Sequence, residues 1–169
     1  TAEDFGFQGE WPSHPALLLV NGLGSQSINY ADEWCRMFAD RELFVIRYDN
    51  RDVGLSTKSI DTPYRVTDMA ADGIAVLDAL GVDRAHVMGL SMGGMIVQTM
   101  AIHHRDRLLT MTSVMSRTGE PGFGDSTPEA FAALTGNPAR SPQACALQSR
   151  DALRIWGSPA FADEARLCL

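Results

Sequence analysis

Residues 86–95 read HVMGLSMGGM, in which a serine stands between two glycines directly after a strand-forming run. Helix-forming residues follow Ser91, so the chain passes from strand to helix within a very short turn. Such a turn holds its serine in a strained backbone conformation and projects the hydroxyl beyond the carboxyl end of the strand. Gly89 and Gly93 suit the turn because they carry no side chain that would clash. The stretch therefore predicts a strand, turn and helix of a parallel sheet.

Short apolar runs alternate with longer amphipathic runs over the first two-thirds of the chain, which is typical of βαβ units. The apolar runs are continuous, as expected for parallel strands that helices cover on both faces. The amphipathic run between Thr67 and Gly81 has an N-cap residue at its start and a glycine at its end. We expect strands near residues 16–20, 43–48, 85–89 and 109–115, and helices near residues 30–39, 68–80 and 92–103.

The composition changes after Ser116. Residues 117–128 contain three glycines and two prolines, which indicates a loop that leaves the sheet. Three later pairs combine an N-cap hydroxyl with a proline in the first helical turn, so we expect short helices laid over the sheet. These pairs are Thr127–Pro128, Ser141–Pro142 and Ser158–Pro159.

The composition also narrows the classes of partner. The chain has 169 residues and a formal net charge of -7, and its basic residues form no run, so we expect no nucleic-acid partner. Its apolar stretches fall short of the roughly 20 residues that cross a bilayer, so we expect no membrane partner. Cys35, Cys145 and Cys168 lack the spacing of disulfide frameworks and zinc sites, and we expect no metal and no cofactor. No secretion signal is visible, so a cytoplasmic location is predicted.

Ser91 is the candidate nucleophile, because the turn presents its hydroxyl and the following helix N-terminus favours a developing oxyanion. A second stretch, NGLG at residues 21–24, follows the first expected strand, from which such sites draw another amide donor. We expect the amides of Leu23 and Met92 to hold the oxyanion. Taken alone, either stretch also fits an ordinary glycine-rich connection. The glycines that support the two turns are Gly22, Gly24, Gly89 and Gly93.

Three motifs in this order resemble the α/β-hydrolase superfamily, in particular its lidded esterase-like branch with aclacinomycin methylesterase-like and proline iminopeptidase-like proteins. They are NGLG, RYDNRDVGLS and GLSMGG, and the likeness covers about residues 17–116. The resemblance implies an α/β-hydrolase fold, a mainly parallel sheet flanked by helices, in residues 1–116 and the start of a helical lid in residues 117–169. Together with right-handed crossovers it implies the spatial strand order second, first, third, fourth.

Two features of the motifs concern the structure of the loops. Many members of the superfamily have histidine where this chain has Asn21, a residue that usually shapes the loop. Asp49, Arg51 and Gly54 match the superfamily pattern D-x-R-x-x-G-x-S. We interpret these three as loop residues that hydrogen-bond the local backbone.

The resemblance implies that an acid and then a histidine follow the nucleophile along the chain. His103 and His104 stand at the far end of the helix after Ser91, roughly 18 Å away, whereas a general base must come within about 3 Å. His86 lies about 16 Å upstream in its strand. His14 precedes its strand and belongs at the opposite sheet edge. None of the four histidines suits the role of the base.

Acidic residues cannot replace the missing general base. Glu120 and Asp125 follow the last strand, but a carboxylate without an imidazole activates serine poorly, and we interpret both as loop residues. The apolar strand near residues 109–115 would also be an exposed edge. We therefore expect the C-terminal part of the fold to lie outside this chain, in the same polypeptide or in a separate one.

Two hypotheses follow. The first is a metal-free serine hydrolase of the carboxylesterase type, in which Ser91 attacks the acyl carbon of a small ester-like substrate. The alternative is a non-catalytic α/β-hydrolase-like ligand-binding module or an inactive fragment. A serine nucleophile argues against haloalkane dehalogenase and epoxide hydrolase chemistry, which use a carboxylate. Apolar residues near the turn favour an apolar acyl or alcohol group, although methionine beside a sheet is often core: Leu23, Leu90, Met92, Met95 and Met115.

Overall fold

The computed structural model describes residues 2–3, 14–59, 61–136 and 139–157. The chain divides into two compact units, Thr1–Phe123 and Gly124–Leu169. Each unit is described by itself.

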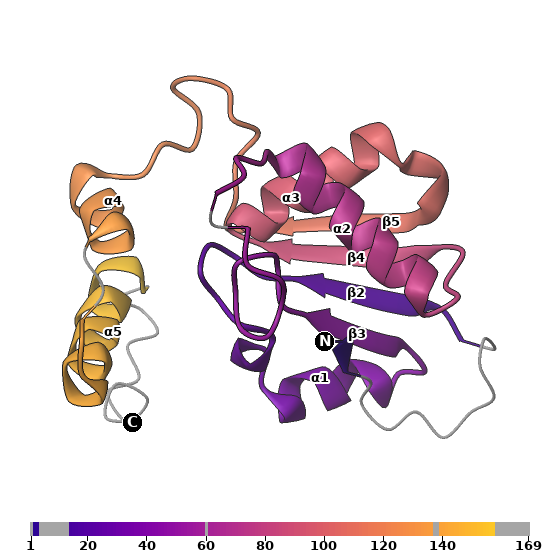
Figure 1. The fold of residues 1–169 in the computed structure, drawn as a ribbon, viewed down its shortest axis with the longest axis horizontal. Helices are drawn as coiled ribbons and strands as arrows, with labels where there is room; N and C mark the ends of the chain where they lie inside the picture. Colours follow the sequence, from indigo (N-terminus) through magenta and orange to yellow (C-terminus); the bar gives the residue numbers. More distant parts are fainter. Residues whose placement is uncertain (1, 4–13, 60, 137–138, 158–169) are drawn as a thin grey trace. The chain divides into compact units, whose positions relative to one another are not determined.

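The first unit is built on a mainly parallel sheet (Figure 1). Its strands run in the spatial order β3-β2-β4-β5, which confirms the predicted order second, first, third, fourth. A further strand, β1, pairs antiparallel with β3. The sequence analysis missed β1 because two residues are too short to show a pattern. The strands are β1 (Ala2–Glu3), β2 (Ala16–Val20), β3 (Phe44–Tyr48), β4 (Ala85–Leu90) and β5 (Leu108–Val114).

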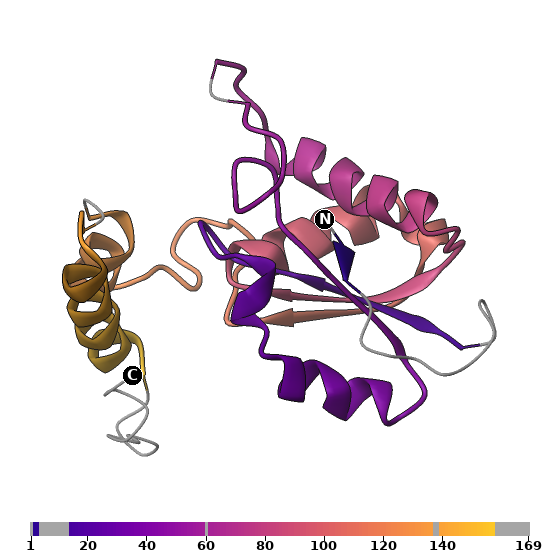
Figure 2. The same ribbon diagram turned by 60° about the horizontal axis from the view of Figure 1, so that its bottom comes forward.

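Helices cover both faces of this sheet. Helices α2 (Val66–Ala79) and α3 (Met92–His103) lie on one face and α1 (Asp32–Ala39) on the other (Figure 2). Alternate residues of β2 point to opposite faces, so Leu18 packs with α2 and α3 while its two neighbours pack toward α1. The continuous apolar run of β2 is therefore buried on both faces, as its sequence predicts.

Several element boundaries differ from the predicted ones by one or two residues. Helix α2 begins at Val66 instead of Asp68, because the Asp68 carboxylate accepts a hydrogen bond from the Arg65 amide at 2.7 Å and so caps an earlier start. Helix α1 is preceded by a separate 3-10 turn, η1 (Ser27–Asn29). A second 3-10 turn, η2 (Arg105–Arg107), leads into β5, which ends at Val114. Met115 then takes a positive φ of 48° and leaves the strand.

Strand β5 lies at one edge of the described sheet. Leu109 and Met111 on this strand each keep 40% of their surface exposed. In contrast, β2 in the middle of the sheet is buried throughout. The β4–β5 side of the sheet is thus the less covered side among the described residues.

The second unit contains α4 (Pro128–Thr135) and α5 (Pro142–Trp156). Two of the three predicted helix starts are confirmed: Thr127 Oγ1 accepts from the Ala130 amide and Ser141 Oγ from the Ala144 amide, each at 3.2 Å. The third, Ser158–Pro159, lies outside the described residues. That these helices begin a lid over Ser91 stays a prediction. Among the described helices, none combines the length and apolar character that a membrane span requires.

Candidate active site

Ser91 occupies the turn between β4 and α3. Its backbone has φ 57° and ψ -120°, a conformation that is costly for a residue with a side chain. Its side chain makes no capping hydrogen bond to α3, although it stands at the N-cap position. The Ser91 amide instead donates to the Val114 carbonyl at 2.9 Å, which ties the turn to the neighbouring strand β5. The hydroxyl is therefore held at the strand end without being used by the helix.

The two glycines that flank Ser91 have no room for a side chain. A methyl group on Gly89 would lie 2.0 Å from the Gly93 carbonyl oxygen. A methyl group on Gly93 would lie 2.0 Å from the Val20 carbonyl oxygen. Helix α3 can thus start directly against β2 and β4 only because these positions are glycine.

The loop after β2 passes beside Ser91. A Cβ built on Gly22 would lie 3.2 Å from Ser91 Cβ and 3.7 Å from Ser91 Oγ. Gly22 and Gly89 are 67 residues apart in the sequence. The two motifs that contain them therefore meet at one sheet edge through the fold. A side chain at position 22 would fill the space next to the hydroxyl.

A tight turn orients the Leu23 amide. The Gly22 carbonyl accepts a hydrogen bond from the Ser25 amide at 3.3 Å, and Gly24 has φ 68°, as the third residue of a type II turn requires. Because the peptide is trans, the Leu23 N–H points away from this bonded carbonyl. Met92 is the first residue of α3, so its amide has no partner within the helix. Both amides keep the oxyanion-hole role assigned to them as a prediction.

Buried amide side chains hold the same loop. Asn21 is 2% exposed, and its Nδ2 donates to the Gln26 carbonyl at 2.6 Å. Asn50 is 1% exposed, and its Nδ2 donates to the Asn21 carbonyl at 3.0 Å. The sequence analysis named Asn21 as a loop residue and missed Asn50, whose signal was its place two residues after the end of a strand in the RYDNRDVGLS motif.

Asp49 joins the loops that follow β2 and β3. Its carboxylate accepts from the Ser27 amide at 2.7 Å and from the Leu55 amide at 3.0 Å. Burial acts to raise the pKa of Asp49, but these hydrogen bonds outweigh burial and the pKa lies below its ordinary value. Gly54 is needed here because a Cβ would lie 2.0 Å from Asp49 Oδ2. Asp49 thus bonds the local backbone, as predicted, and a distant segment as well.

Arg51 differs from its predicted role. Its Nε and Nη2 each lie 2.6 Å from an oxygen of the Asp72 carboxylate on α2. Its guanidinium also lies over the Tyr64 ring, 4.9 Å from the ring centre. The prediction that Arg51 bonds the local backbone is wrong, because the Asp72 carboxylate on α2 accepts a bidentate, charge-assisted pair of hydrogen bonds from its guanidinium.

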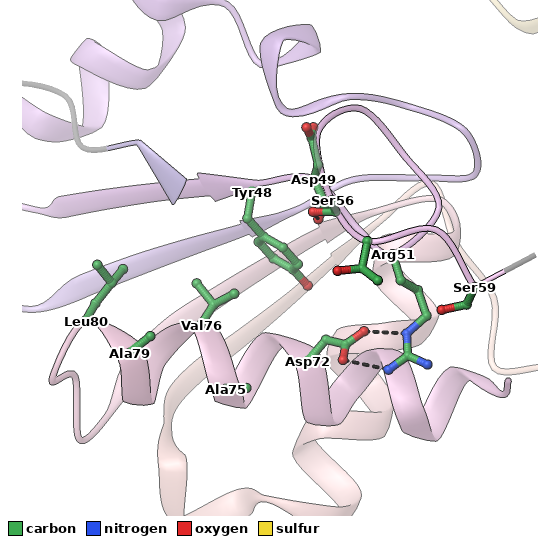
Figure 3. A pocket seen from close by; sticks show the side chains of 11 residues that line it. Tyr48, Asp49, Arg51, Ser56, Ser59, Asp72, Ala75, Val76, Ala79 and Leu80 are labelled. Atoms are coloured by element: carbon green, nitrogen blue, oxygen red, sulfur yellow. Dashed lines mark hydrogen bonds and ion pairs between the residues drawn. The ribbon is translucent and has the colours of Figure 1, made fainter. Parts of the chain in front are cut away.

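A cavity of about 520 Å³ lies between the loop after β3 and helix α2 (Figure 3). Its walls include the Arg51–Asp72 pair at one end and Val76 and Leu80 at the other. None of its lining residues belongs to the Ser91 turn or to the loop after β2. The cavity is therefore separate from the candidate active site.

The histidines stand where the sequence places them along the elements. His103 is the last of the 12 residues of α3, at the end remote from Ser91. His86 is on β4, with Nδ1 2.8 Å from Thr110 Oγ1. His14 precedes β2 and His104 directly follows α3. Glu120 and Asp125 lie outside helices and strands, between β5 and α4, which confirms them as loop residues. That neither takes part in catalysis stays a prediction.

Exposed apolar side chains follow the carboxyl ends of the parallel strands. Leu23 is 55% exposed and Met115 is 69% exposed, whereas Leu90, Met92 and Met95 are partly buried. The sequence analysis did not single out Ile28 and Leu55, which are 64% and 82% exposed in the loops after β2 and β3. Exposed apolar side chains thus occur in the loops that follow β2, β3 and β5.

Comparison with known proteins identifies the family to which this fold belongs. Residues 15–147 match the family described as alpha/beta hydrolase fold. Rhodomycin D methylesterase DauP of Streptomyces sp. (strain C5) is 37% identical over 161 residues, and Rhodomycin D methylesterase DnrP of Streptomyces peucetius is 36% identical over 159 residues. Each alignment covers 92% of this chain and 52% of the relative, so the chain spans about half the length of these relatives. The solved enol-lactonase from Burkholderia xenovorans LB400 is 27% identical, with a TM-score of 0.63 over 86% of this chain and 53% of that chain.

Proposed function

This chain belongs to the alpha/beta hydrolase fold family, and we propose that it supplies the nucleophile and the oxyanion hole of a serine hydrolase for small-molecule esters. The observation that carries the proposal is the approach of Gly22 to the Ser91 side chain. This approach supports a placement of the Leu23 amide and the N-terminus of α3 on the same side of the sheet edge as the strained serine. In the proposed arrangement, the oxyanion formed at Ser91 faces these two backbone donors.

In the proposed reaction, Ser91 Oγ forms a bond to the acyl carbon while its proton passes to a general base. The carbonyl π electrons move to the oxygen, and the Leu23 and Met92 amides hold the resulting oxyanion. Collapse of this intermediate expels the alcohol, which takes up the proton. Water then attacks the acyl-enzyme in the same way and releases the acid. Fixed backbone donors need no rearrangement as charge develops, so they favour the transition state over the bound ester.

The base and its acid are proposed to come from outside this chain. The described histidines occupy the far end of α3, the β4 strand and the segment before β2, and none of these positions adjoins the Ser91 turn. The relatives are about twice as long as this chain, which leaves room for such a pair.

The proposed substrate is a methyl ester or a lactone with an apolar acyl part. Two relatives are named methylesterases and the solved neighbour an enol-lactonase, and esters and lactones share the acyl–oxygen bond that a serine attacks. The exposed side chains of Leu23 and Met115 suit an apolar group beside Ser91.

A fluorophosphonate probe tests the proposal. We expect the polypeptide that extends this chain to the length of its relatives to form one adduct, located at Ser91 by mass spectrometry. The adduct should vanish in Ser91→Ala and persist in Ser116→Ala, a matched serine that follows the neighbouring strand. The 169-residue chain should label far more slowly, because it lacks a base.

Two other labelling results would contradict parts of the proposal. Equal labelling of the short and the extended polypeptide would mean that a base lies within this chain. Absence of labelling in both would refute the hydrolase proposal and favour the ligand-binding module.

A further inference from the structure

The loop that carries the predicted oxyanion donor is fastened at both ends by two consecutive residues. Asn50 holds the start of the loop through the Asn21 carbonyl, and Asp49 holds its end through the Ser27 amide. These partners are 29 and 22 residues away in sequence, so both links depend on the adjacency of β2 and β3. The inference drawn from these two hydrogen bonds rests on the proposed function.

The contact made by Asn50 is unusual in its chemistry. The side chain is 1% exposed, and its Oδ1 atom has no hydrogen-bond partner among the described residues. Burying an unpaired amide oxygen is unfavourable, so Asn50 carries a cost at this position that its donated hydrogen bond must offset. Within the part of the chain that the structure describes, the Asn50 side chain donates its one hydrogen bond to the Asn21 carbonyl. The Asn50 side chain therefore holds the peptide group between Asn21 and Gly22 in position.

That peptide group controls the approach of the loop to Ser91. The Asn21 carbonyl precedes Gly22, whose Cα stands beside the Ser91 side chain. On its other side the same carbonyl faces α3, because a Cβ on Gly93 would lie 2.7 Å from the Asn21 oxygen. The carbonyl is thus fixed between Asn50 and Gly93. Rotation of this peptide would redirect the chain through Gly22 and move the Leu23 amide away from Ser91.

We propose that Asn50 is a positioning residue for the oxyanion hole, acting through the Asn21 carbonyl to hold the Leu23 amide toward Ser91. It touches neither the substrate nor the reacting atoms. A displaced donor weakens the stabilisation of the negative charge that develops in the transition state. Loss of Asn50 should therefore slow the chemical step and leave ground-state binding of the substrate nearly unchanged.

The experiment has two arms, both on the extended polypeptide used for labelling. The first arm follows amide hydrogen exchange of Gly22, Leu23 and Ser25 in Asn50→Leu, which keeps the side-chain volume and removes the donor. Asn50→Ala serves as a second variant should the leucine prevent folding. We expect these loop amides to exchange at least tenfold faster while the amides of β2 keep their protection.

The second arm compares the rate of Ser91 phosphonylation and the kcat and KM for a methyl ester. We expect labelling and kcat to fall about tenfold or more, toward the loss seen when an oxyanion donor is removed, with KM changed less than twofold. Ile74→Val, a buried change in α2 away from the loop, is the control for general loss of stability and should leave both rates unchanged.

The outcomes separate the inference from the proposed function. Faster loop exchange with unchanged labelling and kcat would refute the positioning role, and so would unchanged loop exchange. A rise in KM at constant kcat would assign Asn50 to substrate binding instead. An unlabelled wild-type protein would refute the proposed function itself, and the positioning role would fall with it whatever the exchange arm showed.

Discussion

Replacing Asp49 by asparagine tests how strongly its carboxylate holds the two loops at the sheet edge. The carboxylate accepts backbone hydrogen bonds from Ser27 at 2.7 Å and Leu55 at 3.0 Å. Asparagine has almost the same shape but keeps one acceptor oxygen, so one of these amides would face an N–H donor. A hydrogen bond to a charged acceptor contributes about 1.5–3 kcal/mol, and we expect Asp49→Asn to lower the free energy of unfolding by about 2–3 kcal/mol at pH 7.

The pH dependence follows from the direction of the pKa shift. The pKa of Asp49 in the folded protein lies below its ordinary value, because the backbone hydrogen bonds outweigh the effect of burial. The carboxylate therefore contributes its full stability above about pH 4, the unfolded value, and loses it as the pH falls through the folded pKa. The difference between wild type and Asp49→Asn should be largest near neutral pH and shrink in acid.

Urea unfolding followed by circular dichroism at pH 7, 5 and 3 measures this difference. With a slope of about 2 kcal/mol/M, the midpoint of Asp49→Asn should fall by about 1 M at pH 7. The control is Asp61→Asn, an exposed residue near the same loop, which should stay within about 0.5 kcal/mol of wild type. An equal loss at pH 7 and pH 3 would refute the reasoning, because the charge of the carboxylate would then contribute nothing.

Four further predictions concern the free energy of unfolding, which urea unfolding measures. Gly93→Ala should lower stability by about 3 kcal/mol, because its methyl would lie 2.0 Å from the Val20 carbonyl oxygen. Gly24→Ala, where a Cβ meets nothing within 4 Å, should cost only the positive φ of 68°, about 1–2 kcal/mol, and similar losses in the two variants would contradict the packing argument. Ser91→Gly should be about 1 kcal/mol more stable than Ser91→Ala, since glycine tolerates φ 57°; equal stability would mean that the turn is unstrained. Tyr48→Phe should raise stability by up to about 1 kcal/mol because it removes a buried hydroxyl that has no hydrogen-bond partner among the described residues, and a decrease would show that this hydroxyl is bonded.

Much of the fold follows from local features of the sequence. Continuous apolar runs and helical spacing predict the four parallel strands and three helices of the first unit to within a few residues. The glycines around Ser91 predict the turn, because only residues without side chains allow α3 to start so close to β2 and β4. Strand β1 escaped prediction because two residues carry no periodicity.

The contacts that build the candidate site came from the tertiary structure instead. Gly22 meets Ser91, Asn50 bonds Asn21, and Arg51 pairs with Asp72 rather than with its own loop. Each link joins segments at least 21 residues apart, so no local pattern specifies it. Local propensity decides which residues form a strand or a turn. Which loops meet depends on the order and register of the strands, and these are set only when the whole sheet packs between its helices.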